Sequence, residues 1–298
     1  MNLTNAFFNG LLIESHKALR SRWTLGLVVV MLIVIFYANL TSYQFALQGQ
    51  DTMVKIKKIQ GSNFKEWVLA DDGARPLREA IWGLTPDATR NLFLAVLGAI
   101  GPMLSILWGA NLVGSEFAWK TSRIRAAHYG WPKTIATKIV LIIIASIITV
   151  VMISVLSVVA SQIIWHYATS SIEVAKWIKP PIVQFSLLKQ VLSLILGLST
   201  YGLLGATLAL LIRSTAAGSV IGLAIPFAEK VIDKWWLPQS AFSYILNKQI
   251  VYSQGGAISP PPLTSNPPMS WYPWIIMLIW MAAFIFILWL ASRRQEIV

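Results

Sequence analysis

Long apolar stretches without a single charged residue are the main feature of this sequence. Five of them separate consecutive charged residues: Arg22 and Asp51, Arg90 and Glu116, Lys138 and Glu173, Lys189 and Arg213, and Lys248 and Arg293. A helix that crosses a bilayer needs about 20 mostly apolar residues, and each stretch has room for one such helix. A sixth stretch, which begins at Ser214, is shorter. It reaches that length only if Glu229 and Lys230 lie at the lipid headgroups, or if the helix is broken at Pro226.

These stretches predict an all-α integral membrane protein with six transmembrane helices. We place the crossings at residues 23–41, 91–113, 139–165, 187–212, 216–232 and 271–291. Residues 42–90 and 228–270 are then outside segments. The first is long enough for short helices but is not expected to build a core of its own. The second ends in a proline-rich run that is typical of an extended connector.

The N-terminal residues have an amphipathic pattern ahead of the first crossing. Residues 1–22 are therefore predicted to form a helix in the cytoplasmic membrane interface, followed by a membrane domain over residues 23–298. The alternative is a cytoplasmic extension of the first transmembrane helix. The first apolar run is too long for a cleavable signal peptide, so we expect it to stay as an anchor.

Lysine and arginine near the ends of the crossings set the expected orientation. They are in excess over acidic residues in the N-terminal segment, in the loop at residues 114–138, at Arg213 and in the tail after Ala291. The positive-inside rule places these segments in the cytoplasm and predicts an N-in, C-in topology. Without the crossing at 216–232 the basic tail would lie outside, so six crossings fit the rule better than five.

Composition excludes several classes of protein. Apolar residues make up 56% of the chain and charged residues 12%, whereas soluble domains have roughly 25% charged residues. The net charge of +12 is spread over juxtamembrane clusters, which favours anionic lipid over nucleic acid as the partner. Cysteine is absent, the three histidines are far apart, and no phosphate-binding loop motif occurs. We therefore expect no metal, no cofactor and no ATP site in this chain, and no enzymatic activity of its own.

Small residues recur at four-residue spacing in the predicted crossings. Examples are Ser105 and Gly109 in one crossing, and Gly218 and Gly222 in another. Small side chains allow helix backbones to approach closely within lipid, so packing is the favoured interpretation. A polar path for a substrate is the alternative, and the serines of crossing 139–165 are open to the same two interpretations.

The segment between crossings 91–113 and 139–165 carries the clearest functional pattern. Ser115 is predicted to cap a short cytoplasmic helix over residues 116–128, which Gly130 and Pro132 would end. An aromatic residue at its start and a mixed charged surface suit docking into a groove of another protein. The alternative is that its basic residues form a solvated cluster that obeys the positive-inside rule.

At this segment the chain resembles the membrane-spanning subunit of type-2 ATP-binding-cassette exporters, the ABC-2 permease family. Members have a glutamate and an aromatic residue after the second helix, then a hydroxyl residue and a basic one. Glu116, Phe117, Thr121 and Arg123 match this pattern, whereas Lys120 stands where glycine is usual.

Further resemblance comes from residues 213–218 and 238–243, and together the similarities cover essentially the whole chain. The resemblance implies a homodimer in which each copy receives a cytoplasmic ATPase subunit that binds ATP and Mg²⁺. Helix 116–128 would be the coupling helix of this two-plus-two complex. Its implied contacts are Phe117 and Ile124 in the ATPase groove, Lys120, Arg123 and Arg125 at an acidic rim, and Glu116 with Arg20 or Arg22.

The resemblance also implies a function. The chain would be the permease subunit of an exporter in a bacterial cell membrane. Its cargo would be amphipathic or hydrophobic, such as a peptide antibiotic, a drug or a lipid-like molecule. The alternative is a membrane sensor or immunity protein that binds a peptide through its outside segments and has no transport cycle.

Overall fold

The structure is a computed structural model of the chain. It describes residues 64–70, 72–118, 131–177, 186–232, 234–249 and 269–295, together with isolated helical residues between positions 12 and 55. Every element in these ranges is helical: α3 (Phe64–Ala70), η2 (Asp72–Ala74), α4 (Arg75–Gly83), α5 (Pro86–Ala118), α7 (Trp131–Ser171), η3 (Glu173–Lys176), α8 (Leu187–Ile212), α9 (Thr215–Ile232), α10 (Pro238–Gln249) and α11 (Tyr272–Gln295).

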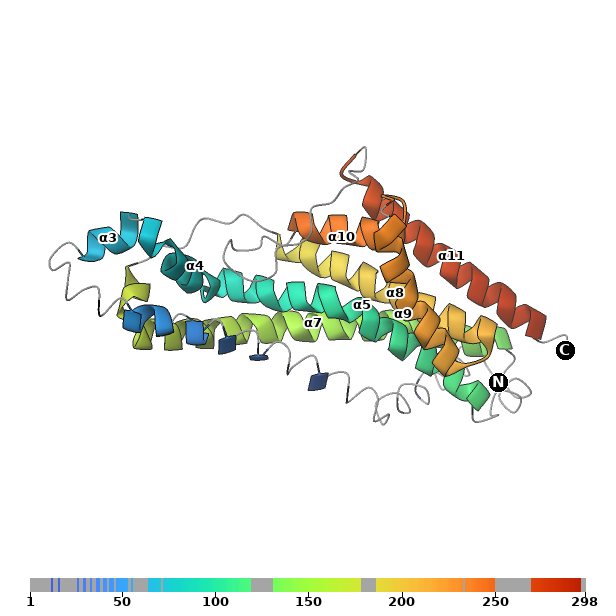
Figure 1. The fold of residues 1–298 in the computed structure, drawn as a ribbon. Helices are drawn as coiled ribbons and strands as arrows, with labels where there is room; N and C mark the ends of the chain where they lie inside the picture. Colours follow the sequence, from blue (N-terminus) through green and yellow to red (C-terminus); the bar gives the residue numbers. More distant parts are fainter. Residues whose placement is uncertain are drawn as a thin grey trace.

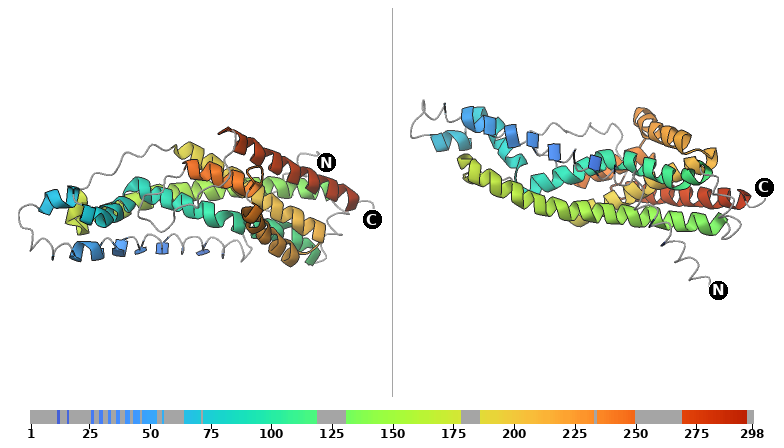
Figure 2. Two further views of the ribbon diagram at one scale, coloured as in Figure 1. Left: turned by 45° about the horizontal axis from the view of Figure 1, so that its top comes forward. Right: turned by 90° about the horizontal axis from the view of Figure 1, so that it is seen from below.

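Four of these helices form an elongated bundle and are long and apolar enough to cross a membrane. The spans are Pro86–Ser115, Pro132–Ser171, Leu187–Ile212 and Tyr272–Arg293. α5, α8 and α11 finish at one end of the bundle, which we call the proximal end, and α7 and α9 begin there (Figure 1). α3 and α4 lie at the opposite, distal end of α7 in all views (Figures 1 and 2).

Most of the predicted crossings correspond to described helices. The predictions at 91–113, 139–165 and 187–212 fall within three of the spans, and the prediction at 271–291 begins one residue before the fourth. The prediction at 216–232 corresponds to α9, which is apolar but shorter than a membrane span. The prediction at 23–41 lies outside the described residues, apart from isolated helical positions, as does most of the predicted interfacial helix 1–22.

The end of α8 shows how the chain turns from one helix into the next. Arg213 has a φ of 56°, the left-handed conformation that ends many helices. The Ser214 hydroxyl then accepts a hydrogen bond from the amide of Ala217 at 3.3 Å and caps α9. α8 and α9 are therefore joined by a very short turn at the proximal end.

Helix α10 follows α9 after a short break and lies along the distal half of α8. The Gln239 side chain meets Tyr201 in α8, and Phe242, one turn later, lies against Gly197. Leu246, a further turn on, contacts Gly98 of α5. The interruption follows Ile232, and α9 continues as a helix through Pro226, where the sequence suggested a possible break.

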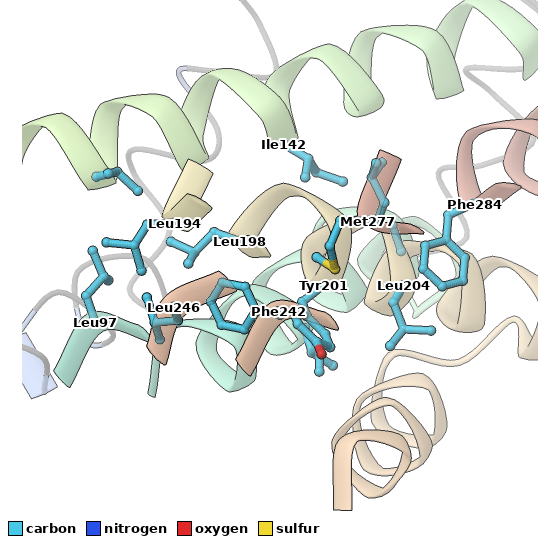
Figure 3. Packing of buried hydrophobic residues seen from close by; sticks show 14 of the residues in the cluster. Leu97, Ile142, Leu194, Leu198, Tyr201, Leu204, Phe242, Leu246, Met277 and Phe284 are labelled. Carbon is cyan, nitrogen blue, oxygen red and sulfur yellow. The ribbon is translucent and has the colours of Figure 1, made fainter. Parts of the chain in front are cut away.

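The main core joins α5, α7, α8, α10 and α11. Figure 3 shows its centre, where Tyr201 lies close to Phe242, with Met277 and Leu204 nearby. The rings of Tyr201 and Phe242 meet edge to face with centroids 6.0 Å apart. Residues Ala241 to Leu246, in the predicted outside segment 228–270, therefore include core positions.

A second, smaller core lies at the distal end, and we call the structure around it the distal lobe. The lobe consists of α3, η2, α4, η3 and the last turns of α7. Its buried residues are Val68, Ala74, Leu77, Ile81, Leu84, Ala168, Ile172, Val174 and Ala175. We expected that residues 42–90 would not build a core by themselves, and the core does include residues from outside this segment. α7 runs to Ser171, beyond the predicted crossing, and supplies the other wall.

Candidate functional site

The proximal junction of α5 and α7 differs from the predicted coupling loop. The prediction that Ser115 caps a separate helix is wrong, because α5 continues through Gly114 and Ser115 to Ala118. Gly114 lies against α9, where an added Cβ would be 2.4 Å from the Thr215 hydroxyl oxygen. Glycine is intrinsically unfavourable within a helix, but this close contact has no room for a larger residue. α7 already begins at Trp131, so the connection is shorter than the predicted 114–138 loop.

The predicted coupling residues fall into two groups. Glu116 and Phe117 lie in the last turn of α5, and Phe117 is partly buried against the main core. Phe117 therefore contributes to the packing of the protein's own core. The others, Lys120, Thr121, Arg123, Ile124 and Arg125, lie outside the described residues, as do Arg20 and Arg22, the predicted partners of Glu116.

A buried lysine lies beside this junction. Lys138, in the second turn of α7, is 1% exposed, and its ammonium donates a hydrogen bond to the carbonyl oxygen of Leu112 in α5. Lys133, one and a half turns earlier, is exposed. The sequence placed Lys138 in the cytoplasmic loop, and its burial follows from the earlier start of α7.

Small residues bring α5, α8 and α9 into backbone contact. A Cβ added at Gly109 would lie 2.0 Å from the carbonyl oxygen of Gly202, and one at Gly205 would lie 2.1 Å from that of Ile106. Ser105 lies beside the same contact. A Cβ added at Gly218 would lie 2.6 Å from the Cα of Ala209 in α8, and Gly222 meets the side chain of Ile106. The four predicted small residues thus lie at helix–helix contacts.

The serines along α7 form hydrogen bonds within their own helix. Ser146 donates to Ile142 and Ser154 to Val150, at 2.9 and 2.7 Å. Ser157 and Ser161 donate to carbonyl oxygens three residues earlier. These hydroxyls are satisfied by backbone, which allows them to be buried within an apolar bundle.

A buried polar cluster lies where α9 gives way to α10. The Glu229 carboxylate, only 7% exposed, accepts a hydrogen bond from the backbone N–H of Gln239 at 2.7 Å. The Tyr201 hydroxyl donates to Gln239 Oε1 at 2.8 Å, and Gln239 Nε2 lies 3.2 Å from the Ser243 hydroxyl. We call these four residues the break cluster. It joins α8, α9 and α10 at the interruption.

Sequence reasoning missed the break cluster. Glu229 was assigned either to the lipid headgroups or to the part of the helix after a break at Pro226, and the residues that follow it to an outside segment. The available signal was Pro238 followed by polar and apolar residues at helical spacing, since proline is favoured in the first turn of a helix. Among the residues described, no group of three potential metal-binding side chains occurs.

The apolar spans and the helical core define the class: this is a helical, membrane-embedded protein. No protein-family model, curated protein or solved structure matches the chain.

Proposed function

We propose that this chain is the permease subunit of an ATP-driven exporter, working as a homodimer with two separate cytoplasmic ATPase subunits. The observation that carries the proposal is the course of α5. This helix runs unbroken from Pro86, next to the distal lobe, to Ala118, at the edge of the segment that resembles a coupling helix.

The last turns of α5 contact two other helices directly. Leu112 accepts the hydrogen bond from Lys138 in α7, and Gly114 lies against Thr215 at the start of α9. Earlier in α5, the side chain of Ile106 lies against Gly222 of α9. Close contacts of this kind leave little free space to absorb a displacement. A push on residues 119–130 would therefore be passed to α7 and α9.

The partner and cargo follow from the same proposal. The ATPase would bind ATP and Mg²⁺ and would contact Lys120, Arg123 and Arg125 through an acidic rim. A shift of α9 relative to α8 would reach the break cluster and change how α10 packs, since helix packing favours discrete arrangements. The cargo would be amphipathic or hydrophobic, such as a peptide, a drug or a lipid-like molecule.

Reversing the charge of the loop tests the ATPase contact. The triple variant K120E/R123E/R125E would face an acidic rim with acidic side chains, so we expect ATPase recruitment to weaken by roughly tenfold or more. The measurement is co-purification of the chain with the ATPase encoded beside it, followed by ATP turnover in lipid nanodiscs. K133E is the control, because Lys133 is exposed at the same end but lies in α7, after residues 119–130. Equal recruitment by the triple variant and the control would contradict the proposed contact.

A sensor or immunity protein is the second candidate, and the distal lobe favours it. The lobe has its own buried core, so it is a folded unit that could present a surface to a peptide. Peptide binding by the chain alone, with no ATPase retained in any preparation, would support this candidate and reject the exporter.

A further inference from the structure

Lys138 is a charged group in an unusual environment. Its side chain is 1% exposed, and its neighbours Ile135, Leu141 and Ile142 are buried as well. Lysines near the end of a membrane helix usually extend their ammonium group towards water. Lys138 is only two turns from the start of α7 and is turned onto α5 instead. Removing a charged group from water is costly, so an ionisable residue buried in this way is a candidate for a functional role.

The position of its acceptor suggests that role. Leu112 lies six residues before Ala118, the last residue of α5, and so close to residues 119–130. The ammonium of Lys138 therefore binds the α5 backbone close to these residues. The contact joins the two helices that enter and leave residues 119–130.

The surroundings of the contact extend it to a third helix. Val113, next to the acceptor, is 2% exposed in the main core, and Gly114 then lies against Thr215 of α9. Thr134 and Thr137, on the same part of α7 as Lys138, are also buried, and Thr137 donates to Thr134 at 2.8 Å. The Thr137 hydroxyl is thus used within α7, whereas the Lys138 ammonium reaches across to α5.

We propose that Lys138 is the positioning residue that ties α5 to α7 at the base of the coupling segment. Through this tie, ATPase-driven movement reaches both helices together. The relay rests on the proposed function, whereas the tie itself is a property of the chain alone. Without the tie, the ATPase would still bind residues 119–130, but its movement would separate the two helix ends and would not be passed on to the bundle.

The experiment compares K138M with K138R and with K133M, each in nanodiscs. Methionine has a similar length and no charge, so it fills the same space and removes the hydrogen-bond donor. Amide hydrogen exchange of the unpartnered chain measures the tie. We expect exchange at residues 112–118 and 131–138 to be at least tenfold faster in K138M, with no change in α8. K138R keeps the charge and the donor, so it should restore slow exchange, and K133M should match the unchanged protein.

Turnover by the complex measures the relay. We expect K138M to retain the same amount of ATPase, while the turnover of the complex relative to the ATPase alone falls at least fivefold and K138R recovers it. Unchanged exchange in K138M overturns the tie, and unchanged turnover, or an equal loss in K133M, overturns the relay. If the unchanged chain retains no ATPase, the proposed function and the relay fail together, while the exchange data still decide whether the tie exists.

Discussion

At the scale of single residues, Glu229 has a clear structural task. The first N–H groups of a helix have no partner within the helix, and Pro238 at the start of α10 has no N–H at all. Glu229 accepts the hydrogen bond from the next residue, Gln239, and so caps α10 from the end of α9. Its carboxylate also faces the positive end of the α10 dipole. The carboxyl group is buried because it completes a helix that begins inside the core.

Removing this cap should loosen α10 selectively. E229A is expected to destabilise the start of α10 by about 1 kcal/mol, the usual effect of losing a helix cap, which corresponds to roughly fivefold faster amide exchange there. E229Q is the matched control, since its amide oxygen can still accept from Gln239. Exchange measured over residues 238–249 tests this. Equal exchange rates in E229A and the unchanged protein would show that α10 does not depend on the cap.

At the scale of elements, the crossing of α5 and α8 is fixed by glycines on both helices. Gly109 lies against Gly202, and Gly205 lies against the backbone of Ile106. Because the nearest atoms are backbone, no side chain can move aside to admit a methyl group. The two helices are therefore held at a distance that only glycine permits.

Adding one methyl group should force these helices apart. G109A is expected to lower the stability of the bundle by about 1–3 kcal/mol, the usual cost of overpacking. Thermal unfolding in detergent or nanodiscs, followed by helical circular dichroism, measures the change. G83A serves as the control, because an added Cβ at Gly83 meets nothing within 4 Å. A midpoint shift as small in G109A as in G83A would count against the close contact.

The helices that were predicted well have signals in their own residues. Charge-free apolar runs located the four spans, and the predicted bounds of α8 agree with Leu187–Ile212. α8 has a serine cap at its start and Arg213 in a left-handed turn at its end, so its limits are local. The four-residue spacing of small side chains also identified contact positions such as Gly109, although the sequence does not name the partner helix.

The failures occurred where distant contacts decide the local structure. Gly114 and Ser115 have the local sequence of a helix boundary. Both lie within α5, however, and Gly114 packs against Thr215 of α9. α10 carries polar residues such as Gln239 and Ser243, so its apolar signal is weak. Gln239 bonds to Ser243 and also to Tyr201 of α8, a residue far away in sequence. Neither effect can be read from periodicity within a single segment.

At the scale of the whole molecule, two separate cores share one helix. The main core and the distal lobe both use α7, whose residues Ile142 and Ala168 belong to one core each. The lobe is further attached through the Tyr43 hydroxyl, which donates to the Ser171 hydroxyl at 3.3 Å, and through the Gln50 amide, which donates to the Ser171 carbonyl. Because the buried residues of the lobe are separate from those of the main core, the lobe should unfold without the bundle.

A core variant in the lobe tests this independence. I81A removes a fully buried side chain and should destabilise the lobe by about 2–4 kcal/mol while leaving the bundle intact. L69A is the control, since Leu69 is 44% exposed. Limited proteolysis should cleave I81A within residues 64–84 much faster than L69A, with the helices of the bundle protected in both. Equal loss of the bundle would show that the two cores unfold as one unit.

The length of α7 has a mechanical consequence. Its 41 residues form a rod of about 60 Å at 1.5 Å per residue, with the Lys138 contact near one tip and the distal lobe on the other. For a rod of this size, a tilt of about 10° at the base swings the far tip through about 10 Å. An angular change too small to disturb the proximal packing would thus carry the lobe across a distance comparable to the width of a helix. Whatever binds the lobe would experience events at the opposite end of the molecule as a large sideways displacement.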